Sequence, residues 1–483
     1  MKLQLLGLTL LAALVDAIPS STNSTIQKRA TPKLVVAHFI LIYALTVGIK
    51  VGIVDGYTQA DWANDISLAA ATGIDAFALN IGTDSWTDTQ LALAYAAARS
   101  TSFKLFISFD FAASPGFSDF NTQIVPRLNL YASDAAQLQW GNGALVSTFS
   151  GDGFDWSGVR SAVGHPLEII PFYQAAQAHQ DSTDGLFMWN AWPSQNNQPI
   201  DQTMSIAGDQ FYQSQLAGSP YMAGVSPWFF THYNPQTFNK NWLYLSDTLL
   251  IDRWNEILNL QPQLVELITW NDFGESHYIG ITTSLPERHT YLINYLGPLH
   301  PERPSVYAPS GDSDGAIQWA AGFPHDAWRK IITPYIAAYK NGGPVTISAS
   351  QENIVYWYRP HPKGLSCSDP FLGPPTGQSF PADGIWAATL LASPATLTMT
   401  SGTFSLTTTA PAGINYFSTG MGSGQPTFKL VRNGVTITQG TGGLSIDLNS
   451  CNIYNFNAFV GSTSIPLISD NSKQSPSIWH EGH

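Results

Sequence analysis

From residue 34 to about residue 345, short apolar runs rich in β-branched and aromatic residues alternate with longer segments of helical periodicity. This alternation constrains the fold strongly, because neighbouring parallel strands need a crossover connection, which a helix usually provides. Several runs are apolar at nearly every position, as expected for strands buried on both faces. Eight runs are found, the number in a closed barrel, so we predict a (β/α)8 TIM-type barrel. The runs are residues 34–39, 76–81, 104–110, 144–149, 167–173, 185–192, 223–230 and 264–272.

Two of the predicted barrel helices have informative local signals. Residues 58–73 begin with Thr58 and Asp61 in the spacing of a capping box, which satisfies the free N–H groups of a first helical turn. The last barrel helix is predicted within residues 325–343, where Pro334 should kink the helix or mark a break.

The sequence changes character after residue 343, where short Thr- and Ser-rich runs alternate with turns. Asn433 and Gly434 stand between two alternating runs, as in a tight β-hairpin. We therefore predict a catalytic barrel over residues 30–343 and an antiparallel β-sandwich domain over residues 344–483.

The N-terminus has the pattern of an exported protein. Residues 1–17 have a lysine near the start, an apolar stretch too short to span a bilayer, and a small-residue exit, as in a signal peptide. Residues 18–29 are polar and end in a dibasic pair, as in a processed pro-segment. No later run is apolar and long enough for a membrane helix. We expect a secreted protein, extracellular or in the cell wall, in which Cys367 and Cys451 form a disulfide.

Charge and motif content exclude several classes of function. The formal net charge is -13 with 21 Lys plus Arg, so no basic surface for nucleic acid is expected. The chain has no His/Cys cluster with zinc spacing, no Gly-rich phosphate loop and no exposed-nucleophile serine motif. We therefore expect neither a metal nor a cofactor, and we expect a monomer without a nucleic-acid or membrane partner.

The carboxyl ends of barrel strands usually carry the chemistry of such a fold. Polar, aromatic and acidic residues gather at these ends, with three carboxyls among them. A pair of carboxyls is what acetal hydrolysis needs, because one protonates the leaving oxygen and the other activates water or attacks the anomeric carbon. The residues at the strand ends are His38, Asn80, Asp110, Thr148, Tyr173, Asn190, Trp192, His232, Tyr233, Asp272 and Glu275.

Asp272 and Glu275 are the main catalytic candidates, because they lie three residues apart directly after the eighth predicted strand. The alternative is that one of them caps the following turn or forms a salt bridge there. Asp110 is a third candidate, which would orient water or bind a hydroxyl, although a strand-end Asp is also a common helix cap or turn residue.

Sugar rings pack their apolar faces on aromatic side chains, and their hydroxyls bind polar groups. For the two strand-end histidines, a satisfied histidine in the core is the alternative to a sugar contact. The expected substrate contacts are His38, Asn80, Asn190, Trp192, His232, Tyr233, Trp270 and His277.

A series of motifs in order, among them "AHFI", "LFISFD", "FMWNAWP", "ITWNDFGESHYIG", "GFPHDAWR" and "VYWYRPHPK", resembles the fungal α-1,3-glucanases, or mutanases, of glycoside hydrolase family 71. The resemblance implies a (β/α)8 barrel with an accessory β-sandwich, hydrolysis of α-1,3-glucan with anomeric inversion, and no cofactor. It also implies that Asp272 and Glu275 in "WNDFGES" are the catalytic pair and that Asp110 is a further acidic position of the cleft.

The chain departs from the family pattern at residues 41–50, which are interposed between the first strand and the first helix. The sequence "VGI" recurs on either side of Lys50, which suggests a retained intron in the gene model. An insertion here would lie on the rim of the cleft, where it could obstruct substrate and affect the role of His38.

Two other functions remain possible from the sequence alone. The protein could be a glycosidase for another glucan linkage, or a noncatalytic wall protein that holds polysaccharide in an aromatic cleft. The sequence does not assign the acid and base roles between Asp272 and Glu275.

Overall fold

The computed structural model describes residues 32–41, 43–44, 49–50, 54, 56–113, 116–280, 315–369 and 372–463, which belong to one compact unit. The predicted signal peptide and pro-segment lie outside the described residues. Part of the insertion at residues 41–50 also lies outside them. The strands described within it are β2 (Tyr43–Ala44) and β3 (Ile49–Lys50), which pair antiparallel.

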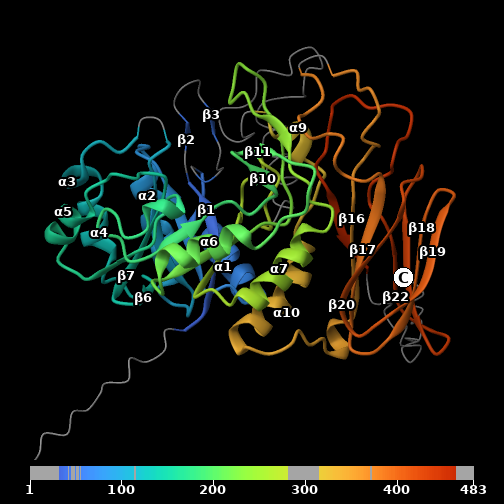
Figure 1. The fold of residues 1–483 in the computed structure, drawn as a ribbon, viewed down its shortest axis with the longest axis horizontal. Coiled ribbons are helices and arrows are strands. Elements are labelled where there is room, and N and C mark those ends of the chain that lie inside the picture. The colour runs from blue at the N-terminus through green and yellow to red at the C-terminus, as the bar shows by residue number, and fades with distance from the viewer. Residues whose placement is uncertain are drawn as a thin grey trace, which may run out of the picture. The chain divides into compact units, whose positions relative to one another are not determined.

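Eight parallel strands form the barrel, as predicted (Figure 1). They are β1 (Leu34–Ile40), β4 (Ala76–Ile81), β5 (Lys104–Asp110), β7 (Gly143–Phe149), β8 (Leu167–Ile169), β9 (Leu186–Met188), β12 (Tyr221–Val225) and β15 (Leu264–Leu267). Ladders join them in the order β8, β7, β5, β4, β1, β15, β12 and β9. Phe172, which follows β8, bridges Phe149 of β7 and Phe187 of β9 and so completes the ring.

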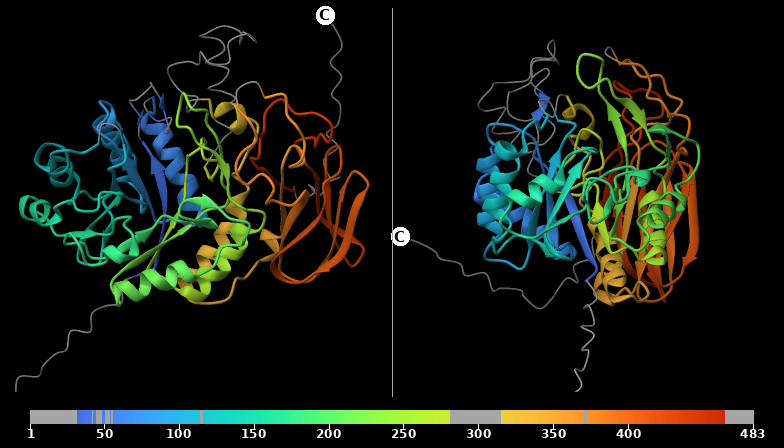
Figure 2. Two further views of the ribbon diagram at one scale, coloured as in Figure 1. Left: turned by 45° about the horizontal axis from the view of Figure 1, so that its top comes forward. Right: turned by 60° about the vertical axis from the view of Figure 1, so that its left-hand side comes forward.

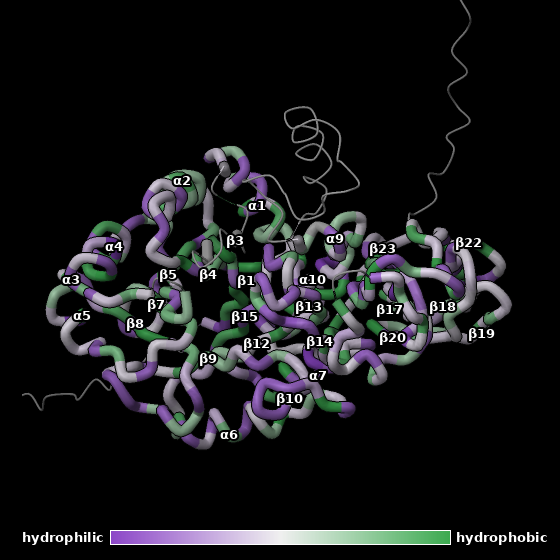
Figure 3. Tube along the Cα trace, turned by 90° about the horizontal axis from the view of Figure 1, so that it is seen from above, coloured by the Kyte–Doolittle hydropathy of each residue, from purple (hydrophilic) through white to green (hydrophobic). Residues whose placement is uncertain are grey.

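Side chains along the barrel strands alternate between two hydrophobic clusters. Phe39 belongs to a cluster that includes helix residues and fills the layer between strands and helices. Val36 belongs to a second cluster, which takes residues from seven barrel strands and fills the interior of the ring; the central strands are coloured as hydrophobic in Figure 3. The same alternation turns His38 of β1, Asn80 of β4 and Asp110 of β5 toward the interior, at the carboxyl ends of their strands.

Helical segments connect most of the strands. The predicted capping box of α1 is confirmed, since Thr58 accepts from the backbone of Asp61 and the Asp61 side chain accepts from Thr58. Helix α10 continues through Pro334, so the proline does not end it. The segments are α1 (Gln59–Thr72), α2 (Thr87–Ala98), α3 (Phe120–Gln123), α4 (Val125–Tyr131), α5 (Trp156–Ala162), η1 (Ala175–Gln177), α6 (Ala207–Leu216), α7 (Leu249–Leu260), α9 (Ile317–Ala320) and α10 (Trp328–Asn341).

Short strands also lie in the loops around the barrel. The antiparallel pair of β13 and β14 follows β12 and carries residues used below. The loop strands are β6 (Gln139–Trp140), β10 (Ser194–Gln195), β11 (Gln198–Pro199), β13 (Phe230–His232) and β14 (Asn241–Leu243).

The C-terminal part consists of two four-stranded antiparallel sheets, as predicted (Figures 1 and 2). The first has the order β20, β17, β16, β23 and the second the order β19, β18, β21, β22. Tyr356 and Phe428 stack between the two sheets with ring centroids 4.2 Å apart. After the 3-10 turn η2 (Ala349–Gln351), the strands are β16 (Asn353–Tyr358), β17 (Gly384–Leu391), β18 (Ala395–Ser401), β19 (Phe404–Ala410), β20 (Gly413–Gly420), β21 (Thr427–Arg432), β22 (Val435–Thr441) and β23 (Phe459–Ser462).

The barrel and the first of these two sheets share one hydrophobic cluster. Trp328 of α10 packs on Trp357 of β16 with ring centroids 4.9 Å apart, and both are buried. The predicted disulfide between Cys367 and Cys451 is confirmed and closes a separation of 84 residues. The boundary between residues 343 and 344 stays a prediction. No helix in the described ranges is apolar over the length that a bilayer requires.

Candidate active site

A cavity of about 320 Å3 opens at the carboxyl ends of the barrel strands. It brings together six of the residues predicted from the sequence, and its wall also contains Ile40, Ala112, Ala113 and four larger side chains. The four larger side chains are Phe149, Trp189, Phe238 and Lys240. The six predicted residues are His38, Asn80, Asp110, Tyr233, Asp272 and Glu275.

A second cavity of about 530 Å3 adjoins the first. Both are lined by Phe149, Trp189, Lys240 and Glu275, so they form one cleft that is continuous past Glu275. The predicted residues Asn190 and Trp192 line this second part, together with the aromatic rings of Phe172, Phe229, Trp242 and Tyr244. The cleft therefore has the apolar ring faces and polar groups that a polysaccharide chain requires.

Asp272 and Glu275 have structural contacts as well as a place in the cleft. The Asp272 N–H donates to Thr269 Oγ1 (2.9 Å), and the Glu275 N–H donates to Asp272 Oδ1 (2.8 Å). Glu275 Oε1 accepts from Lys240 Nζ at 2.6 Å. The turn-capping and salt-bridging roles weighed for these residues are thus present, yet both side chains line the cavity.

His277 lies beneath the two carboxyls. Its Nε2 is 3.1 Å from Glu275 Oε2 and 3.7 Å from Asp272 Oδ2, and its Nδ1 is 3.1 Å from Thr269 Oγ1. Because Thr269 Oγ1 accepts the Asp272 N–H, its own proton can go to His277 Nδ1, which leaves Nε2–H to donate to Glu275. His277 is fully buried and lines neither cavity, so it contacts the carboxyls rather than a sugar.

The surroundings move the pKa values of the two carboxyls in opposite directions. Burial raises the pKa of Asp272, against the opposing effect of His277. Burial also acts to raise the pKa of Glu275, but Lys240 and His277 outweigh it and lower that pKa to about 2. Asp272 therefore keeps its proton to higher pH than Glu275 does, and such a separation of two carboxyl pKa values suits acid–base catalysis.

Asp110 and His38 line the same cavity as the carboxyl pair. Asp110 Oδ1 accepts from the N–H groups of Ala112 and Ala113, so its predicted turn role is present, and burial raises its pKa. His38 Nδ1 lies 2.6 Å from Glu266 Oε1, and its ring meets Trp189 edge-on at 4.8 Å. The buried Glu266 thus orients the His38 ring in the cleft.

Three residues predicted to bind substrate do not line the cleft, namely His277, as described above, Trp270 and His232. Trp270 packs on Phe77 and belongs to the strand–helix layer, because the alternation of β15, which ends at Leu267, does not continue through it. His232 is buried and pairs with Asp369 and Asn241. Like Trp270, it lines neither cavity.

The nearest donor atoms of Asp272, Glu275 and His277 lie within 4.8 Å of one another. A cation could bind at such spacing, but the Lys240 ammonium already neutralises Glu275, so this charge pattern fits a proton-transfer site better. The 4.8 Å limit is below the 6.5–9.5 Å expected between the carboxyl groups of an inverting pair. The 4.8 Å limit is a distance between single oxygen atoms and not between whole carboxyl groups, so inversion of the anomeric centre stays a prediction.

Comparisons with known proteins identify relatives of this chain. Residues 31–473 match the family glycosyl hydrolase family 71. A mutanase of Penicillium rubens is 41% identical over 465 residues, covering 94% of this chain and 95% of the relative. A glucan endo-1,3-alpha-glucosidase of Schizosaccharomyces pombe is 37% identical over 95% of this chain and 99% of its own length. An ascus wall endo-1,3-alpha-glucanase of the same yeast is 28% identical over 88% of this chain and 96% of its own length.

Proposed function

The chain belongs to glycosyl hydrolase family 71, and on this basis we propose that it is an endo-1,3-α-glucanase that hydrolyses the α-1,3-glucan of cell walls. The observation that carries the proposal is the pair of Asp272 and Glu275 in an aromatic cleft, with pKa values moved in opposite directions. The α-1,3 linkage of the proposed substrate is taken from the names of the relatives, and the proposed acid–base hydrolysis is taken from the carboxyl pair in the cleft.

Asp272 is the general acid of this proposal and Glu275 the general base. Asp272 holds a proton that it gives to the leaving glycosidic oxygen, while the Glu275 carboxylate takes a proton from the attacking water. Positive charge develops on the sugar between them, close to the ionised Glu275. Lys240 and His277 keep Glu275 ionised, and His38 with Asp110 lies within reach of sugar hydroxyls.

A substrate panel tests the activity. Purified α-1,3-glucan should release reducing sugar with the protein, whereas dextran, starch and β-1,3-glucan should not, because linkage geometry decides which bond reaches the carboxyl pair. Cleavage of one of the other glucans instead would support the rival glycosidase. Sedimentation with insoluble α-1,3-glucan without any soluble product after long incubation would support the noncatalytic wall protein.

We also propose that hydrolysis inverts the anomeric centre. The first product seen by 1H NMR from an α-1,3-linked oligosaccharide should carry the β configuration at its new reducing end, before mutarotation. A water held by Glu275 on the face opposite to the leaving group gives this outcome. Initial appearance of the α anomer would mean that a carboxylate attacks the sugar directly, and the base role of Glu275 would have to be abandoned.

Secretion and the domain limits belong to the same proposal. Residues 1–17 would act as the signal peptide and residues 18–29 as the pro-segment, with the barrel over 30–343 and the β-sandwich over 344–483. Sequencing the N-terminus of the exported protein tests the processing, with Ala30 as the expected first residue.

A further inference from the structure

The hairpin of β13 and β14 carries two side chains of the cleft. Tyr233 follows β13 and Lys240 precedes β14, and both line the first cavity. The Tyr233 N–H donates to Lys240 O at 2.6 Å, which closes the loop between them. The Phe230 N–H donates to Glu275 O at 3.1 Å. Lys240 therefore reaches Glu275 from a hairpin that is itself attached to the backbone of Glu275.

The loop end of this hairpin, where His232 pairs with Asn241, is held by the C-terminal part of the chain. His232 Nε2 lies 2.8 Å from Asp369 Oδ2, and His232 Nδ1 lies 2.8 Å from Asn241 Oδ1, so one ring joins both strands of the hairpin to Asp369. The side chains of His232 and Asp369 are 3% and 2% exposed. The Asn241 amide donates to Gly373 O (3.0 Å), and the Thr376 N–H donates to Asn241 O (3.0 Å).

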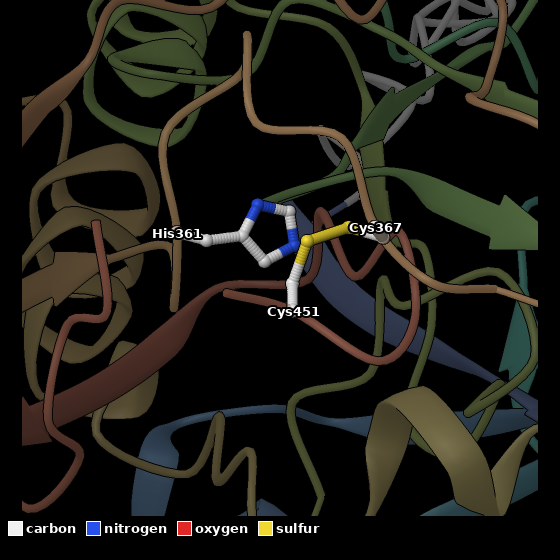
Figure 4. Close-up of side chains that lie close together, drawn as sticks. All are labelled: His361, Cys367 and Cys451. Atoms are coloured by element: carbon white, nitrogen blue, oxygen red, sulfur yellow. A yellow bond between two sulfur atoms is a disulfide. The ribbon is translucent and has the colours of Figure 1, made fainter. Parts of the chain in front are cut away.

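The disulfide fixes the segment that carries Asp369. The Ser368 N–H, next to Cys367, donates to Cys451 O at 2.9 Å. On the other side, the Tyr454 N–H donates to Asp369 Oδ2 at 3.4 Å. Figure 4 shows His361 beside the disulfide, and its Nε2 accepts from the N–H of Asn455 at 3.2 Å. Asp369 is thus held between two segments that the Cys367–Cys451 bond joins.

The same C-terminal segment supports the catalytic turn by a second route. Asn455 and Asn457 each donate a side-chain hydrogen bond to Trp319 O, at 3.2 and 3.0 Å. Trp319 Nε1 donates to the carbonyl of Gly274, between the two catalytic candidates, at 3.2 Å. Its ring also packs on Tyr233 with centroids 5.0 Å apart. The C-terminal part therefore contacts both the hairpin and the turn that meet at the cleft.

We propose that Asp369 is a positioning residue for hydrolysis: acting through His232, it holds the β13–β14 hairpin so that Lys240 stays on Glu275. This inference rests on the proposed function of the site. It assigns the C-terminal part a role in completing the active site rather than a separate polysaccharide-binding role. Movement of the loop that carries Lys240 would displace its ammonium group from Glu275. A displaced contact to a catalytic group lowers turnover more than it lowers substrate affinity.

The kinetic test compares Asp369→Ala, Lys240→Met and the double variant. Asp369→Ala should lower kcat on α-1,3-glucan about tenfold with a smaller effect on KM, since the hairpin supplies the Lys240 contact to the base but only two residues of the cavity wall. Lys240→Met should give a similar loss. The double variant should lose no more activity than the less active of the two single variants, because both changes break the same linkage. Independent, multiplicative losses would contradict the proposal.

The pH profile gives a readout that general destabilisation does not move. Glu275 faces Lys240, His277 and Asp272, with Tyr244 farther away. Its pKa is depressed, so activity that needs the carboxylate is lost as the pH falls through that pKa. Without a held Lys240 the pKa rises, and the acid limb of kcat/KM should move to higher pH in both single variants. An acid limb at the wild-type position in Asp369→Ala would contradict the proposal. In Asp369→Glu, which keeps a carboxylate, the acid limb should lie closer to its wild-type position than in Asp369→Ala.

Asp383→Ala is the matched control, because Asp383 also pairs with a buried side chain of the C-terminal part, Arg359, at 2.6 Å. It should destabilise the protein without moving the acid limb. Hydrogen–deuterium exchange separates failure of this inference from failure of the proposed function. Exchange in residues 233–240 should quicken in Asp369→Ala and stay unchanged in Asp383→Ala, whatever the substrate. Unchanged exchange in Asp369→Ala would overturn the positioning role even if α-1,3-glucan were cleaved.

Discussion

Replacing Asp272 by Asn or Glu275 by Gln should lower kcat on α-1,3-glucan at least about a hundredfold, the scale of a positioned acid or base. Each change keeps the shape of the side chain but removes the group that carries or accepts the proton. Asp272→Asn cannot protonate the leaving oxygen, and Glu275→Gln cannot take a proton from water. Initial rates of reducing-sugar release measure both losses.

Two further assays assign the roles. An α-glucosyl fluoride has a leaving group that needs no proton, so Asp272→Asn should retain activity on it if Asp272 is the acid. Azide, a small anion that fits beside the sugar, should restore turnover in Glu275→Ala if Glu275 is the base. The control is Asp88→Asn, since Asp88 is 71% exposed in a surface pair with Arg127 and should behave as wild type. Near-normal turnover of either cleft variant would remove that residue from the mechanism.

Arg253→Met should destabilise the protein by about 3–5 kcal/mol, the usual loss when a buried charge is left without its partner. Arg253 of α7 and Asp209 of α6 are both fully buried, and the guanidinium holds the carboxylate with two hydrogen bonds of 2.7 Å. Tyr221 of β12 donates to the same carboxylate at 2.6 Å. Loss of the arginine leaves a buried negative charge with one neutral donor.

Urea unfolding at pH 7 followed by tryptophan fluorescence measures this effect. Arg99→Met serves as the control, since Arg99 is 51% exposed in its pair with Asp134 and should cost less than about 1 kcal/mol. Equal midpoints for the two variants would show that the buried pair contributes no more than a surface pair. Replacing Arg253 and Asp209 together by apolar residues should recover part of the loss.

The barrel could be predicted because its strands are buried on both faces and so have nearly continuous apolar runs. The capping box of Thr58 and Asp61 and the hairpin at Asn433 and Gly434 could also be predicted. In both places the local backbone conformation or its free N–H groups favour these residue types. Both hairpin residues have positive φ, at 53° and 78°, as the tight turn requires.

His38, Asn80 and Asp110 could be placed at the cavity from the sequence, because each lies toward the carboxyl end of a barrel strand. Lys240 was not predictable, because it reaches Glu275 from an irregular loop and has no periodic pattern around it. Glu266 did leave a signal that could have been used. It is a charged residue at an inward position of an otherwise apolar strand, and such a residue needs a buried partner, which is His38.

Trp270 and His232 show the limit of reasoning by strand ends. A position just after a strand was taken to face the cleft, but the chain direction changes within one or two residues there. Trp270 turns into the strand–helix layer, and His232 turns toward the C-terminal part. Phe77, which packs on Trp270, and Asp369, which pairs with His232, are distant from them in the sequence, so no local sequence pattern indicates where these side chains point.

The hydrophobic cluster shared by the barrel and the first C-terminal sheet affects how the protein can be degraded or trimmed. A protease that cut near residue 343 would not release an accessory module from an intact enzyme. It would uncover the indole rings of Trp328 and Trp357, which are 1% exposed in the intact protein. The severed barrel would then aggregate, so loss of the C-terminal part would also inactivate the barrel.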